Sequence, residues 1–257
     1  MTMTEATRHT PGAPCWVSLM VHDVEATQDF YAALFGWEFE PGPGQLGPYV
    51  RAVRDGREVA GIGRLPADRD LPVAWTPYLS TADAGATSEA VRSCGGTVGV
   101  GPLDAGAAGR LLIGADPSGA VFGAWQRAAH LGAAVHGGPG TAVWHELLTW
   151  DAGVAKFYEM VFGVEARATG PEGRDRVTLF ADGRRVASVR TADRALLRTR
   201  GPSWMTWFEV EDAAGVARRA VELGGRMDTP PARGAGGVEA TIADPEGAVL
   251  SVVEPRA

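Results

Sequence analysis

The feature that most constrains this chain is an internal repeat. The segment from Cys15 to Asp23 (CWVSLMVHD) is matched by the segment from Val143 to Asp151 (VWHELLTWD), close to half of the 257-residue chain away. Each copy leads into a segment that contains Phe-Tyr and ends in Phe-Gly. Similarity at a fixed spacing marks a repeated structural unit. We therefore predict two related halves.

Two further landmarks recur in the same order. WTPYLSTAD, from Trp75 to Asp83, returns as WMTWFEVED, from Trp204 to Asp212, and each precedes an Ala-rich segment that stops at Gly-Gly, as a helix does. ADPSGAVFGAW, which begins at Ala115, matches ADPEGAVLSVV in the second half. There Asp-Pro-x-Gly indicates a type I turn before an apolar strand. We interpret the chain as a duplication.

Within each half one pattern occurs twice: an extended apolar segment, an Asp, an amphipathic helix that ends at a glycine, and short strands. We predict an α+β fold in which four βαβββ modules pair into two tandem domains. The expected parts are a flexible N-terminus (1–13), a first domain (14–126, modules 14–70 and 71–126), a linker (127–140) and a second domain (141–257, modules 141–201 and 202–257). The linker is Gly-rich and aperiodic, so its His130 and His136 are expected to be solvated residues.

This combination of motifs resembles the vicinal oxygen chelate superfamily of glyoxalases, bleomycin-resistance proteins and extradiol dioxygenases, over nearly the whole chain. Two tandem domains resemble an actinobacterial subgroup labelled glyoxalase-like or hydroxylase. The resemblance implies curved, cup-forming mixed sheets with helices on the convex side, but a fold does not assign chemistry. The residues that carry it are Asp23, Phe30, Tyr31, Phe35, Gly36 and Trp37 in the first half and Asp151, Phe157, Tyr158, Phe162 and Gly163 in the second.

The positions at which metal-using relatives hold their ion are also implied by the resemblance. They lie seven residues before the Asp that opens a helix and seven residues after the Asp of the turn. The side chains there are Trp16, Thr76 and Gly123 in the first half and Trp144, Met205 and Ser251 in the second. A divalent ion needs several oxygen, imidazole or thiolate donors that converge on one point. We therefore expect no metal and no other cofactor.

His145 and Glu146 lie beside one of these positions. Adjacent residues of a strand face opposite sides of a sheet. If Trp144 faces the cup, Glu146 and Leu148 do so too, and His145 lies under the helix. The second copy is one residue shorter before its Phe-Tyr, and a deletion in the strand instead of the turn would turn His145 inward, with Val143 at the ligand position.

The two cups are expected to be aromatic and semi-polar. Such surfaces suit a small organic ligand, although the tryptophans alternatively fill the interior of the sheet. The side chains predicted to face the cups are Trp16, Ser18, Met20, Thr76, Tyr78 and Ser80 in the first half and Trp144, Glu146, Leu148, Met205, Trp207, Glu209 and Ser251 in the second.

The second cup gains carboxylates. Glu146 replaces Ser18, and Glu209 replaces Thr81 or Ser80. Two carboxylates in an apolar cup act as an acid/base pair if their repulsion raises one pKa. Alternatively, Glu209 lies on a solvated rim, and Glu146 is a buried carboxylate that accepts hydrogen bonds from backbone or Trp N–H groups.

Composition narrows the partners. The chain has 24 basic and 31 acidic residues, a net charge of -7, and its arginines are scattered, so nucleic acid is not expected. No apolar stretch approaches a membrane span, and the first residues lack the pattern of a signal peptide. Two cysteines fit a reducing cytoplasm. We expect a monomer that is pseudo-dimeric through its duplication, or a homodimer.

Three functions follow from these features. The leading hypothesis is a metal-independent protein that binds an aromatic or natural-product-like metabolite. The alternative is a cofactor-free enzyme of secondary metabolism, labelled hydroxylase and acting as a lyase, isomerase or cyclase, with Glu146 as its acid/base. The third is a metal-dependent lyase or dioxygenase.

Overall fold

Each half of the chain forms one eight-stranded sheet. The computed structural model describes residues 10–67, 71–128, 137–169 and 175–256, so His130, His136 and most of the expected linker lie outside the described residues. The first half contains β1 (Pro14–Val21), α2 (Val24–Phe35), β2 (Glu38–Pro41), η1 (Gly44–Leu46), β3 (Tyr49–Arg54), β4 (Arg57–Arg64), β5 (Trp75–Ser80), α3 (Ala84–Ser93), β6 (Thr97–Asp104), η2 (Gly106–Ala108), β7 (Gly109–Ala115) and β8 (Val121–Arg127).

The second half repeats the order of the eight strands and two main helices, with an additional helix, α5, and a different placement of 3-10 turns among the described residues. Its elements are β9 (Ala142–Thr149), η3 (Ala152–Val154), α4 (Ala155–Phe162), β10 (Glu165–Ala168), β11 (Arg176–Ala181), β12 (Arg184–Thr191), α5 (Arg194–Arg200), β13 (Ser203–Glu209), α6 (Ala213–Glu222), β14 (Arg226–Arg233), β15 (Gly237–Ala243) and β16 (Val249–Pro255).

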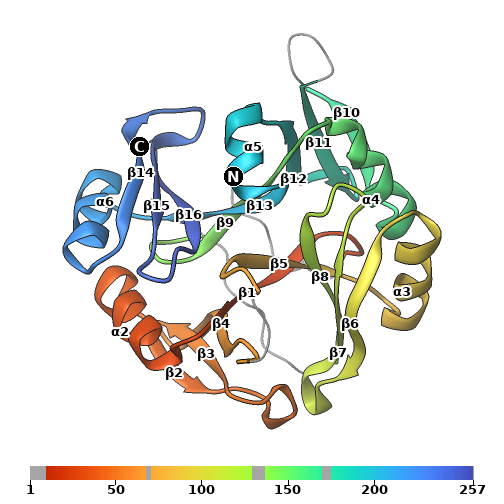
Figure 1. Ribbon diagram of the computed structural model, residues 1–257, viewed down its shortest axis with the longest axis horizontal. Helices are drawn as coiled ribbons and strands as arrows, with labels where there is room; N and C mark the ends of the chain where they lie inside the picture. Colours follow the sequence, from red (N-terminus) through yellow and green to blue (C-terminus); the bar gives the residue numbers. More distant parts are fainter. Residues whose placement is uncertain (1–9, 68–70, 129–136, 170–174, 257) are drawn as a thin grey trace.

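The sheets have the same strand order. It is β2-β3-β4-β1-β5-β8-β7-β6 in the first half and β10-β11-β12-β9-β13-β16-β15-β14 in the second. The first strands of the two modules in each half pair in antiparallel fashion at the centre, and each pairs in parallel with the last strand of its own module. This confirms the predicted α+β fold of paired βαβββ modules in two tandem halves (Figure 1).

The deletion in the second copy of the first landmark lies where its helix begins. In the first half, the Asp23 side chain accepts a hydrogen bond from Ala26 N at 3.1 Å and caps α2. In the second, Asp151 accepts one from Gly153 N at 2.8 Å, and a short 3-10 turn precedes α4. The deletion therefore lies in the turn, as predicted, and the strand before it keeps its facing.

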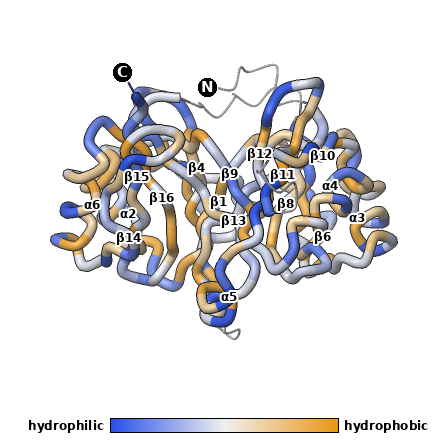
Figure 2. The backbone as a smooth tube through the Cα atoms, turned by 90° about the horizontal axis from the view of Figure 1, so that it is seen from above, coloured by the Kyte–Doolittle hydropathy of each residue, from blue (hydrophilic) through white to orange (hydrophobic). Residues whose placement is uncertain are grey.

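The apolar core is shared between the halves. One cluster joins the back of the first module's sheet and α2 to residues of β13, α6, β15 and β16, and a second joins the second and third modules. The helix α2 therefore lies beside α6, and α3 lies beside α4. Each pair belongs to one of the two lobes seen in Figures 1 and 2. Phe35 and Phe208, one from each half, stack at 5.3 Å between ring centroids. We propose that the halves fold as one pseudo-dimeric unit.

A buried tyrosine links three of the repeated landmarks. The hydroxyl of Tyr31, in the Phe-Tyr motif of α2, accepts a hydrogen bond from Trp75 Nε1 at 3.0 Å. It donates one to Asp244 Oδ2 at 3.1 Å, in the turn of the other half. Burial raises the pKa of Asp244 and the pKa of Tyr31. Asp244 Oδ1 also accepts from Ala248 N at 2.8 Å, so the same carboxylate closes its own turn.

The duplication repeats this arrangement in the other direction. Trp204 Nε1 donates to the Tyr158 hydroxyl at 3.1 Å, and that hydroxyl donates to Asp116 Oδ2 at 2.9 Å. Each half therefore supplies a tyrosine to the turn of the other. Two equivalent contacts fix the halves relative to each other, because a buried polar group without a partner is costly.

We predict that Tyr31→Phe and Tyr158→Phe each lower the free energy of unfolding by about 1–3 kcal/mol. Each substitution leaves a buried indole N–H and a carboxylate oxygen without this partner. Urea denaturation measures the loss. The control is Met160→Ala at a residue that is 54% exposed on α4, for which we expect a change within about 0.5 kcal/mol. Equal stability of the tyrosine variants and wild type would contradict the prediction.

Candidate functional site

The first cup is filled by its own side chains. Trp16, Tyr78 and Trp125 are 4, 5 and 8% exposed, and the rings of Trp16 and Trp125 meet edge to face at 5.7 Å. Leu46 of η1 and Ala108 of η2 pack against this cluster, so two loops cover it. The Gly- and Pro-rich loop around η1 thus lies over the cup.

Tyr49 occupies the centre of the first cup. Its hydroxyl lies 2.6 Å from Ser18 Oγ and accepts a hydrogen bond from Trp16 Nε1 at 2.8 Å. Gly61 makes this possible, because a Cβ there would lie 1.7 Å from the tyrosine oxygen, and one at Gly63 would lie 2.9 Å from the ring. The Tyr49 side chain therefore packs directly over Gly61 and Gly63.

The remaining first-cup candidates support this packing. A Cβ at Gly123 would lie 2.2 Å from the Tyr78 ring. Cys15 is fully buried, with its Sγ 3.4 Å from Tyr78 O, and its thiol packs in the same cluster. Thr76 pairs with Ser18 across the strands, and the sulfur of Met20 lies beside Gly63.

The second cup is open. It holds a cavity of about 380 Å³, within the usual range for small-molecule sites. Its apolar lining is Leu148, Leu196, Met205, Trp207, Ala232 and Ala240, and its polar lining is Glu146, Arg190, Arg200, Asp228, Thr229, Arg233, Glu239, Thr241 and Ser251, with Gly234. Among the predicted residues, Glu146, Leu148, Met205, Trp207 and Ser251 therefore line one cavity.

The sheet registers show why one cup is filled and the other open. Four second-half residues replace four first-half residues, namely Glu146 for Ser18, Arg176 for Tyr49, Ser188 for Gly61 and Arg190 for Gly63. The tyrosine that fills the first cup has thus been exchanged for an arginine, and the glycines beside it for a serine and a second arginine. A charged cluster stands where the first half has an aromatic one.

Glu146 is the centre of this cluster. The residue is 5% exposed. Its Oε1 accepts a hydrogen bond from Ser188 Oγ and lies 3.1 Å from a terminal nitrogen of Arg176, while its Oε2 accepts one from Arg190 Nε at 3.1 Å. Trp144 Nε1 donates to Ser188 Oγ at 3.0 Å. Two guanidinium groups therefore neutralise and orient the carboxylate.

His145 lies on the opposite face from Glu146, as predicted for the register with Trp144 and Leu148 facing the cup. It is 2% exposed, and its Nδ1 lies 3.2 Å from Thr206 Oγ1. Trp144 does not line the cavity but lies farther along the same face, with the Arg185 guanidinium 5.5 Å from the centre of its ring.

A wall of the second cup comes from α5 and β14. Leu197 anchors α5 in a small apolar cluster with Leu148. Arg200, at the end of the helix, forms an ion pair with Asp228 of β14, and Arg226 Nε lies 2.7 Å from the same carboxylate. Burial acts to raise the pKa of Asp228, but the hydrogen bonds from Arg226 and Arg200 outweigh it, and the pKa is lowered.

Trp207, Ser251 and Glu209 lie along β13 and its neighbour. Trp207 pairs with Ser251, whose Oγ lies 3.1 Å from Thr241 Oγ1. Trp207 Nε1 is buried and has no hydrogen-bond partner within the described residues. Glu209 corresponds to Ser80, is half-buried, and does not line the cavity.

The residues present do not fit a divalent metal. Indole, thioether, hydroxyl and glycine stand at the positions that the family uses for ligands. Throughout the described ranges, no three or more His, Cys, Asp or Glu side chains gather in a way that could hold an ion. The carboxylate that lies closest to such a position, Glu146, is held by two arginines.

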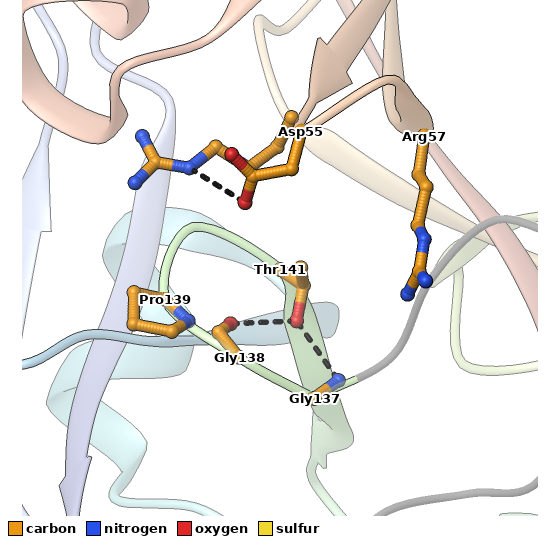
Figure 3. A pocket seen from close by; sticks show the side chains of 7 residues that line it. Asp55, Arg57, Gly137, Gly138, Pro139 and Thr141 are labelled. Atoms are coloured by element: carbon orange, nitrogen blue, oxygen red, sulfur yellow. Dashed lines mark hydrogen bonds and ion pairs between the residues drawn. The ribbon is translucent and has the colours of Figure 1, made fainter.

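A second cavity, of about 300 Å³, lies between the β3–β4 hairpin and the segment before β9 (Figure 3). A terminal nitrogen of Arg54 donates to Phe35 O at 2.6 Å and so caps α2. Thr141 Oγ1 accepts from Gly137 N and donates to Gly138 O, both at 2.9 Å. These contacts hold the chain at the junction of the halves. The cavity has no aromatic lining, and the candidate site is the second cup.

Sequence reasoning missed the arginines of the second cup. Arg176, Arg190, Arg200 and Arg233 come from four elements that only the folded sheet brings together. One signal was available, because Gly61-Ile62-Gly63 aligns with Ser188-Val189-Arg190 in the duplication. This exchange of two glycines for two polar side chains marks a change in the side chains that face the cup.

Comparisons with known proteins support the same assignment of fold. A glyoxalase-like domain model matches residues 148–253, and a bleomycin resistance protein-like N-terminal model matches residues 15–50. The anthracycline biosynthesis protein DauV of Streptomyces sp. (strain C5) is 38% identical, over 97% of this chain and 96% of that protein. The anthracycline biosynthesis protein DnrV of Streptomyces peucetius is 37% identical, over 97 and 96%.

Among solved structures, a Mn(II)-bound glyoxalase from Novosphingobium aromaticivorans superposes with a TM-score of 0.66. The two are 18% identical, and the match covers 96% of this chain and 83% of that one. At this identity the likeness concerns the fold. Among the described helices, none has the length and apolar character needed to cross a membrane.

The filled first cup predicts an unusual alkaline titration. Burial raises the pKa of Tyr49 to about 12 and that of Tyr78 still further, and it also raises the pKa of Tyr31 and Tyr158. These are the four tyrosines of the chain. An unfolded tyrosine has a pKa of about 10. The stability that they contribute is complete below pH about 10 and is lost as pH rises toward their folded pKa values.

We therefore expect tyrosinate absorbance at 295 nm to appear only together with loss of the near-UV circular dichroism signal. Protein unfolded in guanidinium chloride is the control and should titrate near pH 10. A tyrosine that titrates near pH 10 while the circular dichroism signal is unchanged would contradict the packing of the first cup or of the links between the halves.

Proposed function

This chain belongs to the vicinal oxygen chelate superfamily, and we propose that it binds one small aromatic metabolite in the cup of its second half, without a metal ion. The observation that carries the proposal is the contrast between two duplicated cups. One is filled by Tyr49 and the aromatic cluster beside it, and the other contains a cavity of about 380 Å³. A fold that needed both interiors filled would not leave one open.

The lining of the second cup supports an aromatic ligand. Trp207 and Met205 offer a flat indole and an adaptable thioether, and both pack well against rings. Thr241, Ser251 and the arginines supply the polar groups that orient a ligand. Two relatives are named for anthracycline biosynthesis, which supports an aromatic natural product as the ligand class.

We predict that Met205→Trp lowers the affinity of the protein for 1,4-dihydroxyanthraquinone by at least about tenfold, because the added indole fills the cavity. The probe is a planar polycyclic phenol, and its binding is followed by calorimetry and by quenching of tryptophan fluorescence. We expect one molecule per chain.

Thr76→Trp is the matched control, since Thr76 pairs with Ser18 as Met205 pairs with Glu146. It changes the filled cup and should leave the affinity unchanged. Circular dichroism establishes that both variants are folded. Equal loss in the two variants, two molecules bound per chain, or no binding to wild type would each oppose the proposal.

A second candidate function is a cofactor-free enzyme with Glu146 as acid/base. One observation favours it. Glu146 lines the cavity, and among the described residues its Oε2 accepts a single hydrogen bond, from Arg190, which leaves a lone pair for a substrate proton. In this case the bound compound would be converted, and the carboxylate would be needed for turnover more than for binding.

Glu146→Gln separates the two functions. For the enzyme, we expect conversion of the bound compound to fall by about 10²–10⁴-fold with little change in affinity. For the binding protein, we expect no conversion by wild type and a weaker affinity in the variant. Mass spectrometry of the compound after incubation measures conversion, and the exposed Glu25→Gln is the control. Conversion that dialysis against a chelator abolishes would support a metal-dependent lyase or dioxygenase instead.

A further inference from the structure

We infer that the ligand of the second cup is an acid, with a carboxylate or an ionised phenol that Arg190 and Arg233 bind beside its aromatic body. This inference rests on the proposed function, because it concerns the same cavity. It names the chemical class of the ligand and assigns Glu146 as a positioning residue for Arg190.

The charge of the cup is opposite to that of the protein. The whole chain has a net charge of -7. The charged residues that line the cavity, together with their ion-pair partners, include five arginines and three carboxylates: Arg176, Arg190, Arg200, Arg226 and Arg233 with Glu146, Asp228 and Glu239. The cup therefore carries an excess of positive charge on an acidic protein, which favours an anionic ligand.

Arg190 is placed to bind a carboxylate. Its Nε donates to Glu146 Oε2 at 3.1 Å, and this fixes the plane of the guanidinium. Its two terminal nitrogens make no other hydrogen bond to the described residues, and the side chain is 37% exposed along the cavity. Guanidinium groups bind carboxylates through two parallel N–H bonds. One side of Arg190 is thus held by the protein while other donors remain for a ligand.

Arg233 supplies a second guanidinium. It is an exposed residue at the end of β14, lines the cavity, and forms no ion pair with the described residues. In contrast, Arg200 and Arg226 both form ion pairs with Asp228. An arginine that lines a cavity without a carboxylate of its own has its full charge available to a bound anion.

The first half shows that the fold does not require these arginines. Gly63 stands in the place of Arg190, and Asp104 stands in the place of Arg233 at the end of the corresponding hairpin. The strands have the same order in both halves. Two arginines that appear only beside the open cavity are therefore explained by what the cavity binds.

The test compares anthraquinone-2-carboxylate with its neutral isostere, anthraquinone-2-carboxamide, by calorimetry at pH 7.5. We expect wild type to bind the carboxylate at least about tenfold more tightly than the carboxamide. Arg190→Met and Arg233→Met should each lower the affinity for the carboxylate by about tenfold, with little effect on the carboxamide. Glu146→Gln should also reduce the preference for the carboxylate, although it removes a negative charge from the cup, because Arg190 loses the carboxylate that fixes the plane of its guanidinium. An unchanged or stronger preference in this variant would show that Glu146 does not position Arg190.

Arg57→Met is the matched control, because Arg57 is an exposed arginine of the other cavity, in the first half. It removes the same charge and should leave the preference intact. If Arg57→Met lowers the preference as much as Arg190→Met does, the effect is general electrostatics and the inference is wrong. Equal binding of both probes to wild type overturns the inference but leaves the proposed function in place. If neither probe binds at millimolar concentration, the proposed function fails as well.

Discussion

A buried tyrosine hydroxyl between an indole and a carboxylate is the contact on which this architecture depends. Tyr31 joins the first strand of the second module to the turn of the fourth, and Tyr158 joins the first strand of the fourth module to the turn of the second. A buried hydroxyl, indole N–H or carboxylate is costly unless its hydrogen-bond partner is present. The relative placement of the halves is therefore specified by polar contacts within an apolar interface, and the cups face away from that interface.

The same duplication separates what the fold needs from what one site needs. Both sheets have the same strand order, and both bury an apolar face in a core cluster that contains residues of the other half. The concave faces, in contrast, differ. Tyr49 with two glycines closes one, and Glu146 with two arginines leaves the other open. We interpret the first half as a scaffold and the second as the half that acts on a ligand.

The sequence alone was sufficient for features that depend on local pattern. The repeat predicted four modules, and period two correctly placed Glu146 and Leu148 in the cup and His145 behind it. It was insufficient for features that depend on pairing between distant strands. Arg176 and Arg190 reach Glu146 from β11 and β12. The sequence of either strand does not indicate which carboxylate its arginine will contact.

The same limit applies to the state of each cup. Both have a tryptophan on the first strand and an aromatic residue opposite, so both were expected to suit a ligand. Which cup is filled depends on Tyr49, which reaches the centre from β3 because Gly61 has no side chain. The second cup also depends on α5, whose segment has a capping residue, Asp193, and a glycine stop but was too short to be recognised as a wall of the site.

We propose that one cup of the chain binds an organic ligand and that neither holds a metal. Native mass spectrometry with elemental analysis tests this proposal most directly, on protein purified without chelator or affinity metal. We expect a metal-free chain that carries at most one organic molecule. Stoichiometric zinc, iron, nickel or manganese, or two organic molecules per chain, would contradict it.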